Sequence, residues 1–277
     1  MIDFMGIEYA RGATANIRND GPAMAPAAVK QMFPDADWTT VVADNISPDV
    51  AARDRFGDAF TIHKKVYNAT PQTRHIMIGG DHSVNFGHFA TLADRTDDDL
   101  CLVYIDAHLD IHTPETSRIQ ASGAPHGTNV RALLGDGDER WLGLPRRKPA
   151  LKPQNLFYIG TRSFEPAEIE YARANNIYIR TASELKNESD WSRTYNEIMK
   201  QIGRKPFVVS FDFDAIDPTI FPDVWVPEPG GISLAAAKYF VTKFRDADGF
   251  EFVEYAPNGD EKSAKIVHDL ISIVVNG

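Results

Sequence analysis

The chain has 277 residues, of which 43% are hydrophobic and 25% are charged, as in an ordinary globular protein. Its formal net charge is −10, and an acidic surface argues against nucleic acid as a partner because phosphate binding needs a basic footprint. No stretch approaches the ~20 apolar residues that span a bilayer, so we expect no membrane segment. The start "MIDFMGIEYARG" lacks the pattern of a signal peptide, and the single Cys101 allows no disulfide within the chain. We therefore expect a cytoplasmic protein.

Eight short runs rich in Val, Ile, Phe and Tyr follow one another along the chain. Several are continuously apolar rather than alternating, which is typical of strands buried on both faces. The runs span residues 3–10, 39–44, 75–80, 100–107, 156–161, 177–180, 207–214 and 250–257.

Segments with helical apolar spacing lie between these runs and after the last one. They span residues 21–33, 85–95, 166–176, 191–203, 234–246 and 262–276. Strands that alternate with helices predict a three-layer α/β/α fold with a mostly parallel central sheet. The stretch 135–153 is rich in Gly, Pro and charge and is interpreted as a long surface loop. Because similar strands continue on both sides of it, we expect a single domain over 1–277.

Three polar clusters come directly after apolar runs. They are "GGDHS" with Asp81 and His82, "DAHLD" with Asp106, His108 and Asp110, and "SFDFDAIDP" with Asp212, Asp214 and Asp217. Ligands bind beyond the carboxyl ends of the strands in a parallel α/β sheet. Alternate residues of an extended chain face the same side, so Asp106 can converge with His108, and Asp212 with Asp214.

Such a gathering of carboxylates is unfavourable unless a positive charge lies among them. A divalent cation satisfies this need, and imidazole and carboxylate ligands without a thiolate suit Mn²⁺, and also Fe²⁺, Co²⁺ or Zn²⁺. About six ligands are too many for one ion with open positions, which favours two ions that share carboxylates. Each cluster alone has a simpler interpretation; for example, "GGDHS" also fits a turn capped by Asp81 or Ser83.

Taken in order, "GGDHS", "DAHLD" and "SFDFDAIDP" resemble the ureohydrolase family of arginases, agmatinases and formimidoylglutamases, and arginase most closely. The stretches "NDGPAMAPAAVK" and "PEPGGIS" also resemble that family, so the resemblance covers nearly the whole chain. It implies an arginase-like fold, two Mn²⁺ ions per chain, and a homo-oligomer, either a trimer or a hexamer.

The resemblance also implies roles for individual residues. One ion would be held by His82, Asp106, Asp110 and Asp212, and the other by Asp106, His108, Asp212 and Asp214. "ASGAPHGT" resembles the loop that carries a proton-shuttle histidine, here His126. "VEYAP" resembles the segment whose glutamate binds the guanidinium group, here Glu254. Asp110 would both ligate metal and accept a hydrogen bond from the attacking hydroxide.

The substrate contacts follow from two further stretches of the resemblance. "DIHTPETS" resembles the arginase loop that holds an α-carboxylate, with His112, Thr113 and Ser117, and Ser122 further on. "GTRSFEPAE" places Glu165 where arginases have an aspartate near the α-amino group.

Two residues depart from the family pattern near the guanidinium. Val226 replaces a threonine, and Trp225 adds bulk beside it. These departures leave the metal motifs intact and bear on the choice of substrate.

The leading hypothesis is an enzyme that hydrolyses L-arginine to L-ornithine and urea. Agmatinase, formimidoylglutamase or another guanidino or formimino hydrolase is the alternative within the family. Two alternatives lie outside the family. One is a metal-binding regulatory protein without turnover. The other is a deacetylase, because deacetylases have a distantly related fold, but they need a different ligand set for a single zinc ion.

Overall fold

A computed structural model describes residues 2–13, 18–97, 99–117 and 122–277. Its centre is an eight-stranded sheet in the order β2-β1-β3-β8-β7-β4-β5-β6, in which all neighbouring strands are parallel. The strands are β1 (Asp3–Glu8), β2 (Trp38–Val42), β3 (His75–Ile78), β4 (Cys101–Ile105), β5 (Leu156–Thr161), β6 (Tyr178–Thr181), β7 (Phe207–Asp212) and β8 (Gly249–Val253). Each lies within or overlaps one of the eight predicted runs, and the predicted fold class is confirmed.

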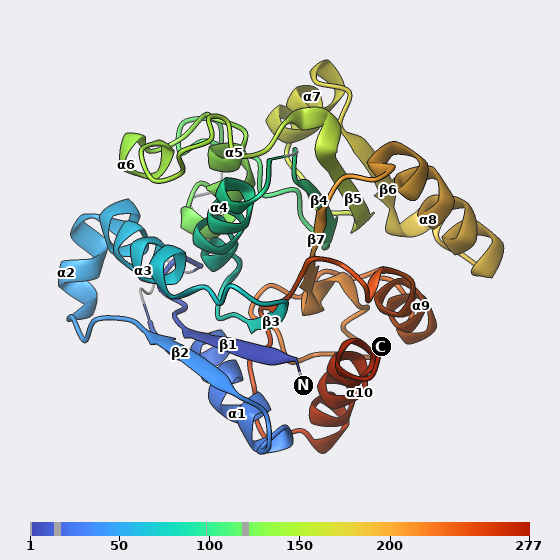
Figure 1. The fold of residues 1–277 in the computed structure, drawn as a ribbon, viewed down its shortest axis with the longest axis horizontal. Coiled ribbons are helices and arrows are strands. Elements are labelled where there is room, and N and C mark those ends of the chain that lie inside the picture. Colours follow the sequence, from blue (N-terminus) through green and yellow to red (C-terminus); the bar gives the residue numbers. More distant parts are fainter. Residues whose placement is uncertain (1, 14–17, 98, 118–121) are drawn as a thin grey trace.

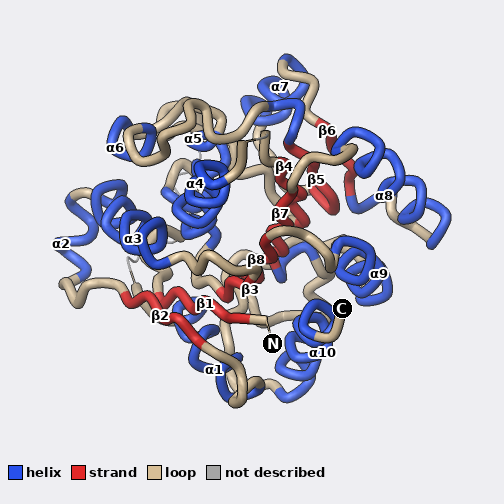
Figure 2. Tube along the Cα trace, in the orientation of Figure 1, coloured by secondary structure: helices blue, strands red, loops and turns tan. Residues whose placement is uncertain are grey.

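Helices cover both faces of the sheet (Figures 1 and 2). One face packs against α1 (Ala25–Met32), α8 (Glu188–Ile202), α9 (Leu234–Phe244) and α10 (Glu261–Val275). The other packs against α3 (Arg55–Ala69), α4 (Asn85–Arg95), α5 (Pro125–Leu133), α6 (Glu139–Leu142) and α7 (Pro166–Ala174). The short α2 (Pro48–Arg53) precedes α3, and two 3₁₀ turns, η2 (His82–Val84) and η5 (Phe213–Ala215), follow strands β3 and β7.

Four helices, α2, α3, α5 and α6, are absent from the predicted set, and α6 revises a predicted loop. The segment 135–153 contains the single turn α6, where Trp141 is fully buried and donates to the carbonyl of Phe56 at 2.9 Å. A tertiary contact therefore fixes a helical turn that Gly and Pro content alone did not indicate. α3 and α5 were not predicted; α5 is only nine residues long and contains Gly127, which weakens its helical signal.

One row of residues runs straight across the sheet and faces α3–α7. The pairing register aligns Met5, Met77, Glu251, Ser210, Tyr104, Tyr158 and Ile179. In this row Glu251 and Ser210 are fully buried polar residues, and the hydroxyls of the two tyrosines are also buried. Such side chains need hydrogen-bond partners inside the protein, so this row ties the sheet to the segments above it.

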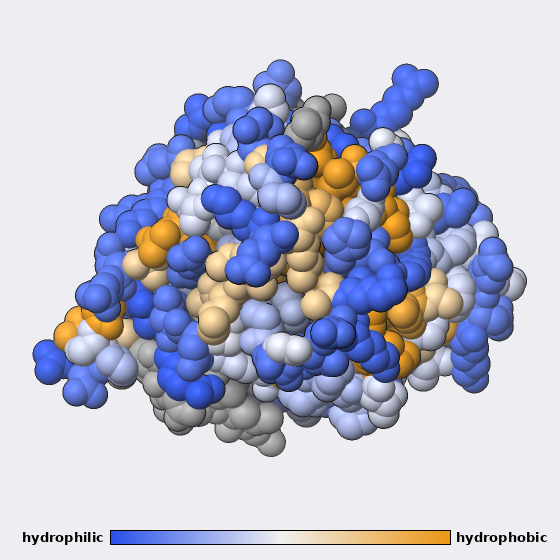
Figure 3. All heavy atoms as spheres, turned by 90° about the horizontal axis from the view of Figure 1, so that it is seen from below, coloured by the Kyte–Doolittle hydropathy of each residue, from blue (hydrophilic) through white to orange (hydrophobic). Residues whose placement is uncertain are grey.

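The face seen in Figure 3 is mostly hydrophilic, with smaller apolar patches between hydrophilic residues. Among the described residues, no helix combines the length and the apolar character that crossing a membrane requires.

Candidate active site

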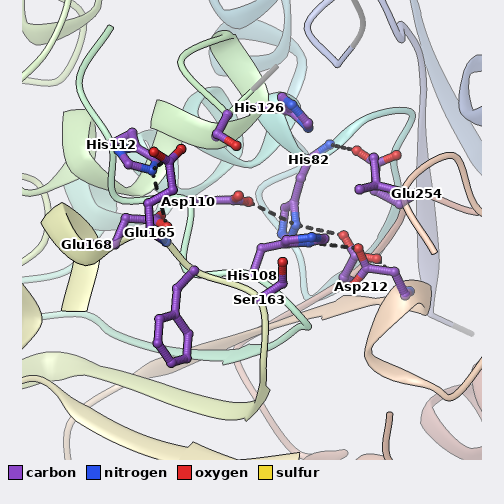
Figure 4. Close-up of a pocket in the computed structure, with 15 residues that line it drawn as sticks. His82, His108, Asp110, His112, His126, Ser163, Glu165, Glu168, Asp212 and Glu254 are labelled. Carbon is purple, nitrogen blue, oxygen red and sulfur yellow. Dashed lines mark hydrogen bonds and ion pairs between the residues drawn. The ribbon is translucent and has the colours of Figure 1, made fainter. Parts of the chain in front are cut away.

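The three sequence motifs meet at the carboxyl edge of the sheet. His82 lies in η2 after β3, Asp106 follows β4, and Asp212 ends β7. Glu254 directly follows β8, which lies between β3 and β7. The strand order therefore brings together side chains that are up to 172 residues apart, as the backbone N–H of His82 shows by donating to Glu254 Oε1 at 2.8 Å (Figure 4).

His82 faces a first group of carboxylates. Its Nδ1 lies 2.9 Å from Asp106 Oδ2, 3.0 Å from Asp212 Oδ2 and 3.7 Å from Asp110 Oδ2. One ligand atom each of His82, Asp106 and Asp110 lie within 4.8 Å of one another, close enough to hold one metal ion.

His108 faces a second group. Its Nδ1 lies 3.0 Å from Asp214 Oδ2 and 3.5 Å from Asp106 Oδ1. Asp106, His108 and Asp214 form a second convergent set, and Asp106 belongs to both sets through its two oxygens. A carboxylate shared in this way can bridge two neighbouring ligand groups.

The charges in these two groups do not balance. Four buried carboxylates face two imidazoles. Burial and the neighbouring Asp106 raise the pKa of Asp110 to about 7, and burial together with Asp214 and Asp106 raises the pKa of Asp212 well above its usual value. For Asp106, burial alone would raise the pKa, but the neighbouring imidazoles of His108 and His82 lower it below its usual range.

The imidazoles respond to the same carboxylates. Burial alone would lower the pKa of His82, but Asp106 and Asp212 outweigh it and raise that pKa well above the usual value. Asp106 Oδ2 is buried and, among the described residues, makes no hydrogen bond of proper geometry, although it lies 2.9 Å from His82 Nδ1. Imidazole nitrogens and carboxylate oxygens that converge in this way, with some hydrogen bonds not made, fit a site for a divalent cation.

The "GGDHS" motif builds a tight turn. A Cβ at Gly80 would lie 1.6 Å from the carbonyl oxygen of Tyr9, so no larger residue fits there. Asp81 accepts from the backbone N–H groups of Gly12 at 2.7 Å and Ser83 at 3.0 Å. Asp81 therefore caps the turn, as the simpler interpretation of this motif proposed, while His82 reaches the cluster.

Two site residues have left-handed backbone conformations. The φ angles are +53° for Asp110 and +63° for Glu254, a region that costs non-glycine residues free energy. Both are held by backbone hydrogen bonds, from Val130 N–H to the carbonyl of Asp110 at 3.2 Å and from Glu254 N–H to Gly80 at 2.9 Å. The bends turn both carboxylates toward the pocket (Figure 4).

A cavity opens over the cluster, with about 730 Å³ of empty space that includes the open solvent at its mouth. The predicted site residues that line it are His82, His108, Asp110, His112, Ser122, His126, Glu165, Asp212, Asp214 and Glu254. Val226 also lines it. Asp106, Thr113 and Ser117 are not among the lining residues: Asp106 is buried beneath the cavity, and Ser117 donates to Glu165 Oε1 at 2.7 Å.

The far end of the pocket holds one imidazole between two glutamates. His112 Nε2 lies 3.2 Å from Glu165 Oε1 and 3.2 Å from Glu168 Oε2. Although burial opposes it, the neighbouring carboxylates of Glu168 and Glu165 raise the pKa of His112. In Figure 4 this group and Glu254 lie on opposite sides of the pocket, with Asp110 between them.

Several supporting residues were missed by the sequence analysis. Ser210 lies with its Oγ 2.8 Å from His82 Nε2, and Glu168 pairs with His112. Ser210 stands two residues before Asp212, so extending the alternating series of β7 backward would have found it. Asp217, by contrast, accepts from the N–H groups of Gly230 and Gly231 at 2.9 and 3.1 Å and shapes the loop beside the pocket.

The fold and the site define a class: α/β proteins with a parallel sheet and, at its carboxyl edge, a carboxylate–imidazole cluster that could hold metal. The family model described as "Arginase family" matches residues 5–275, and the chain belongs to the arginase family.

Relatives and solved structures agree with this assignment. Rat mitochondrial arginase-2 is 31% identical over 211 residues, which cover 72% of this chain and 58% of the rat protein. Arginase from Bacillus subtilis is 32% identical over 192 residues, covering 68% and 63%. The matched segments thus span less than two thirds of either relative.

Solved structures share the fold. Arginase from Bacillus subtilis has a TM-score of 0.84 at 23% identity, covering 100% of this chain and 98% of that one. Formimidoylglutamase from the same species has a TM-score of 0.76 at 20% identity, covering 99% and 85%.

Proposed function

We propose that this protein is a hydrolase that cleaves a C–N bond of a guanidino compound at a binuclear Mn²⁺ centre, with L-arginine as substrate and L-ornithine and urea as products. The observation that carries the proposal is the pair of convergent ligand groups that share Asp106. Membership in a family whose relatives are named arginase supports the reaction type.

The proposed ligands are the six residues of the three motifs. His82, Asp106, Asp110 and Asp212 would hold one ion, and Asp106, His108, Asp212 and Asp214 the other. When bound, two such cations supply Lewis acidity that makes hydroxide available from water near neutral pH. The imbalance of four buried carboxylates against two imidazoles supports this assignment.

Glu254 is suited to bind the guanidinium group. Its Oε1 accepts from the His82 backbone, whereas its Oε2 is buried and has no hydrogen-bond partner among the described residues. A carboxylate oxygen that lines the pocket in this state can pair with a planar cation and orient its central carbon toward the attacking water.

The bond-breaking step needs a hydrogen-bond acceptor for the attacking water and a proton donor for the leaving nitrogen. Asp110 lines the pocket beside His82 and would accept a hydrogen bond from the attacking water. As the new C–O bond forms at the guanidino carbon, the C–N bond to the side-chain nitrogen breaks, and that nitrogen must gain a proton. His126, in the first turn of α5 and on the pocket wall, is the proposed general acid, because imidazole titrates near neutral pH.

The opposite end of the pocket is suited to an α-amino group. Glu165 would bind the ammonium, and His112 with Glu168 holds Glu165 in place. Thr113, Ser117 and Ser122 are the proposed carboxylate-side residues; of these, Ser122 lines the pocket. An extended substrate with a cation at each end thus matches acidic groups at both ends of the cavity.

The Val226 departure supplies the main alternative. Val226 lines the pocket with a side chain that cannot hydrogen-bond, so contacts to the substrate body differ from those of a threonine. Agmatine and formimidoylglutamate therefore remain the competing substrates.

The test is a panel of guanidino and formimino compounds with added Mn²⁺, assayed for urea, ammonia and formamide. Arginine should give the highest kcat/KM and release urea. Faster turnover of agmatine or formimidoylglutamate would overturn the choice of substrate but keep the binuclear hydrolase, whereas no turnover of any compound would overturn the enzyme. We also propose that the protein is cytoplasmic, that residues 1–277 form one catalytic domain, and that the chain assembles as a trimer or hexamer. Size-exclusion chromatography would test the oligomeric state.

A further inference from the structure

Tyr104 lies directly beneath the metal cluster and is not used by the proposed reaction. It occupies the central row of the sheet, paired with Ser210 on one side and Tyr158 on the other. Its side chain is fully buried, and its ring stacks on the imidazole of His82 with centroids 4.3 Å apart and planes 8° apart. It therefore touches a proposed metal ligand with its ring.

The hydroxyl of Tyr104 contacts a second proposed metal ligand, Asp110. It donates to Asp110 Oδ2 at 2.7 Å, within the range of a strong hydrogen bond to a carboxylate. The side-chain amide of Asn129 lies 3.4 Å from the same oxygen and 3.5 Å from the Tyr104 hydroxyl. The same amide donates to the backbone carbonyl of His126 at 2.5 Å. One buried network thus joins Asp110, His82 and the turn that carries His126.

Asp110 needs such support more than the other carboxylates do. Asp212 ends strand β7, and Asp106 directly follows β4, whereas Asp110 lies five residues beyond β4 in a left-handed conformation. Its two oxygens have different tasks in the proposed reaction, so their orientation must be fixed. A donor held by the sheet fixes one oxygen and leaves the other for the pocket.

We propose that Tyr104 is a positioning residue for hydrolysis: its hydroxyl, assisted by Asn129, orients the Asp110 carboxylate between the metal centre and the attacking water. The proposal rests on the proposed function for its kinetic part. Its metal-binding part stands independently, because orienting a ligand affects metal affinity whether or not a substrate is turned over.

The test compares Tyr104→Phe with Tyr9→Phe. Both remove the hydroxyl of a fully buried tyrosine that donates to an aspartate, but Tyr9 donates to Asp58 at 3.2 Å, a carboxylate that binds Arg11 rather than the cluster. Thermal unfolding should show similar losses of stability in the two variants. Calorimetric titration with Mn²⁺ should show affinity about 10-fold weaker for Tyr104→Phe and unchanged for Tyr9→Phe.

With saturating Mn²⁺, Tyr104→Phe should lower kcat about 10-fold and leave KM for the substrate within about 2-fold. The reason is that the network contacts Asp110, which would orient the attacking water, and none of the proposed substrate-binding residues. Asn129→Ala should act in the same direction with a smaller effect, since its contact is longer. Wild-type Mn²⁺ affinity and kcat in Tyr104→Phe would overturn the proposal, and so would equal losses in Tyr9→Phe. If the wild-type protein turned over no guanidino compound, the proposed function would fail, while the titration would still decide the role of Tyr104.

Discussion

Two clusters of histidines and acids lie in the same structure, and they differ in the number of carboxylates for each imidazole. At the carboxyl edge, His82 and His108 face Asp106, Asp110, Asp212 and Asp214. On the face that packs against α4, Glu251 contacts His88 Nδ1 at 2.5 Å and accepts from Asn85 at 2.5 Å, and His88 Nε2 lies 2.7 Å from His75 Nε2. Both clusters are built from one sheet and the helices that follow its strands.

The second cluster has one carboxylate and two imidazoles, and the amide oxygen of its Asn85 makes no hydrogen bond among the described residues. One carboxylate there serves an amide and an imidazole, the second imidazole contacts the backbone carbonyl of Thr73 at 2.8 Å, and all four side chains are buried. The first cluster has an excess of carboxylates and a cavity above it. A group of histidines and acids therefore indicates a metal centre only when its charges do not cancel and its donors face a common open point.

The largest effect on turnover should come from Asp106→Asn, because Asp106 belongs to both ligand groups. We expect loss of bound metal and loss of activity to background, measured by elemental analysis and by urea release. In the wild-type protein a chelator should abolish activity and Mn²⁺ should restore it. A variant with full metal content, or a fully active wild-type protein with one ion per chain, would contradict the binuclear assignment.

Next in size is His126→Asn, which removes the proposed proton donor without touching a ligand. We expect kcat to fall roughly 10²–10⁴-fold, with metal content near that of the wild-type protein. Kinetics and elemental analysis on the same preparation separate the two roles: unchanged kcat at neutral pH removes His126 from the mechanism, and loss of metal makes it a ligand.

Glu165→Gln should act on binding rather than on chemistry. If arginine is the substrate, loss of a charge-assisted contact worth about 1.5–3 kcal/mol should raise KM roughly 10-fold or more and change kcat little. Steady-state kinetics with arginine measure this. An unchanged KM would mean that the pair of Glu165 with His112 is structural only.

Glu251→Gln tests the second cluster, in which Glu251 contacts His88 and Asn85. The amide can still accept from His88, but its N–H then faces that of Asn85, so the protein should lose about 1–3 kcal/mol of stability. Metal content and kcat should stay near those of the wild-type protein. Denaturant unfolding and elemental analysis provide the measurements, and loss of metal would show that the two clusters are coupled.

The smallest effect on turnover is expected for His63→Phe. His63 is fully buried beside Trp141 and Phe86, its ring nitrogens have no hydrogen-bond partner among the described residues, and burial lowers its pKa to about 3. Between pH 6.5 and about 3 the unfolded chain binds a proton that the folded chain does not, so stability falls as pH falls. The variant should lose up to about 1.4 kcal/mol per pH unit of this dependence, measured by unfolding from pH 7 to pH 4.5. An identical pH dependence in both proteins would mean that His63 is protonated in the folded state.

The sequence by itself determined the strands and the residues that follow them. Apolar runs that end in acid and imidazole are local features. Their period and order predict a parallel sheet with His82, Asp106 and Asp212 at its carboxyl edge. Every parallel strand ends at the same edge, but the motifs meet because β3, β7 and β4 lie close together in the strand order, which the sequence did not predict.

Only the tertiary structure decided the rest. Tyr104 and Ser210 look like ordinary members of apolar strands, and their place beneath Asp110 and His82 depends on the pairing of β4 with β7. The position of His112 between Glu165 and Glu168 depends on how the loop after β4 packs against the start of α7. Apart from the hydrogen bond from Tyr104 to Asp110, which spans six residues, these contacts join segments about 50 or more residues apart. No local pattern encodes such a separation, and the packing of the sheet and its loops sets it.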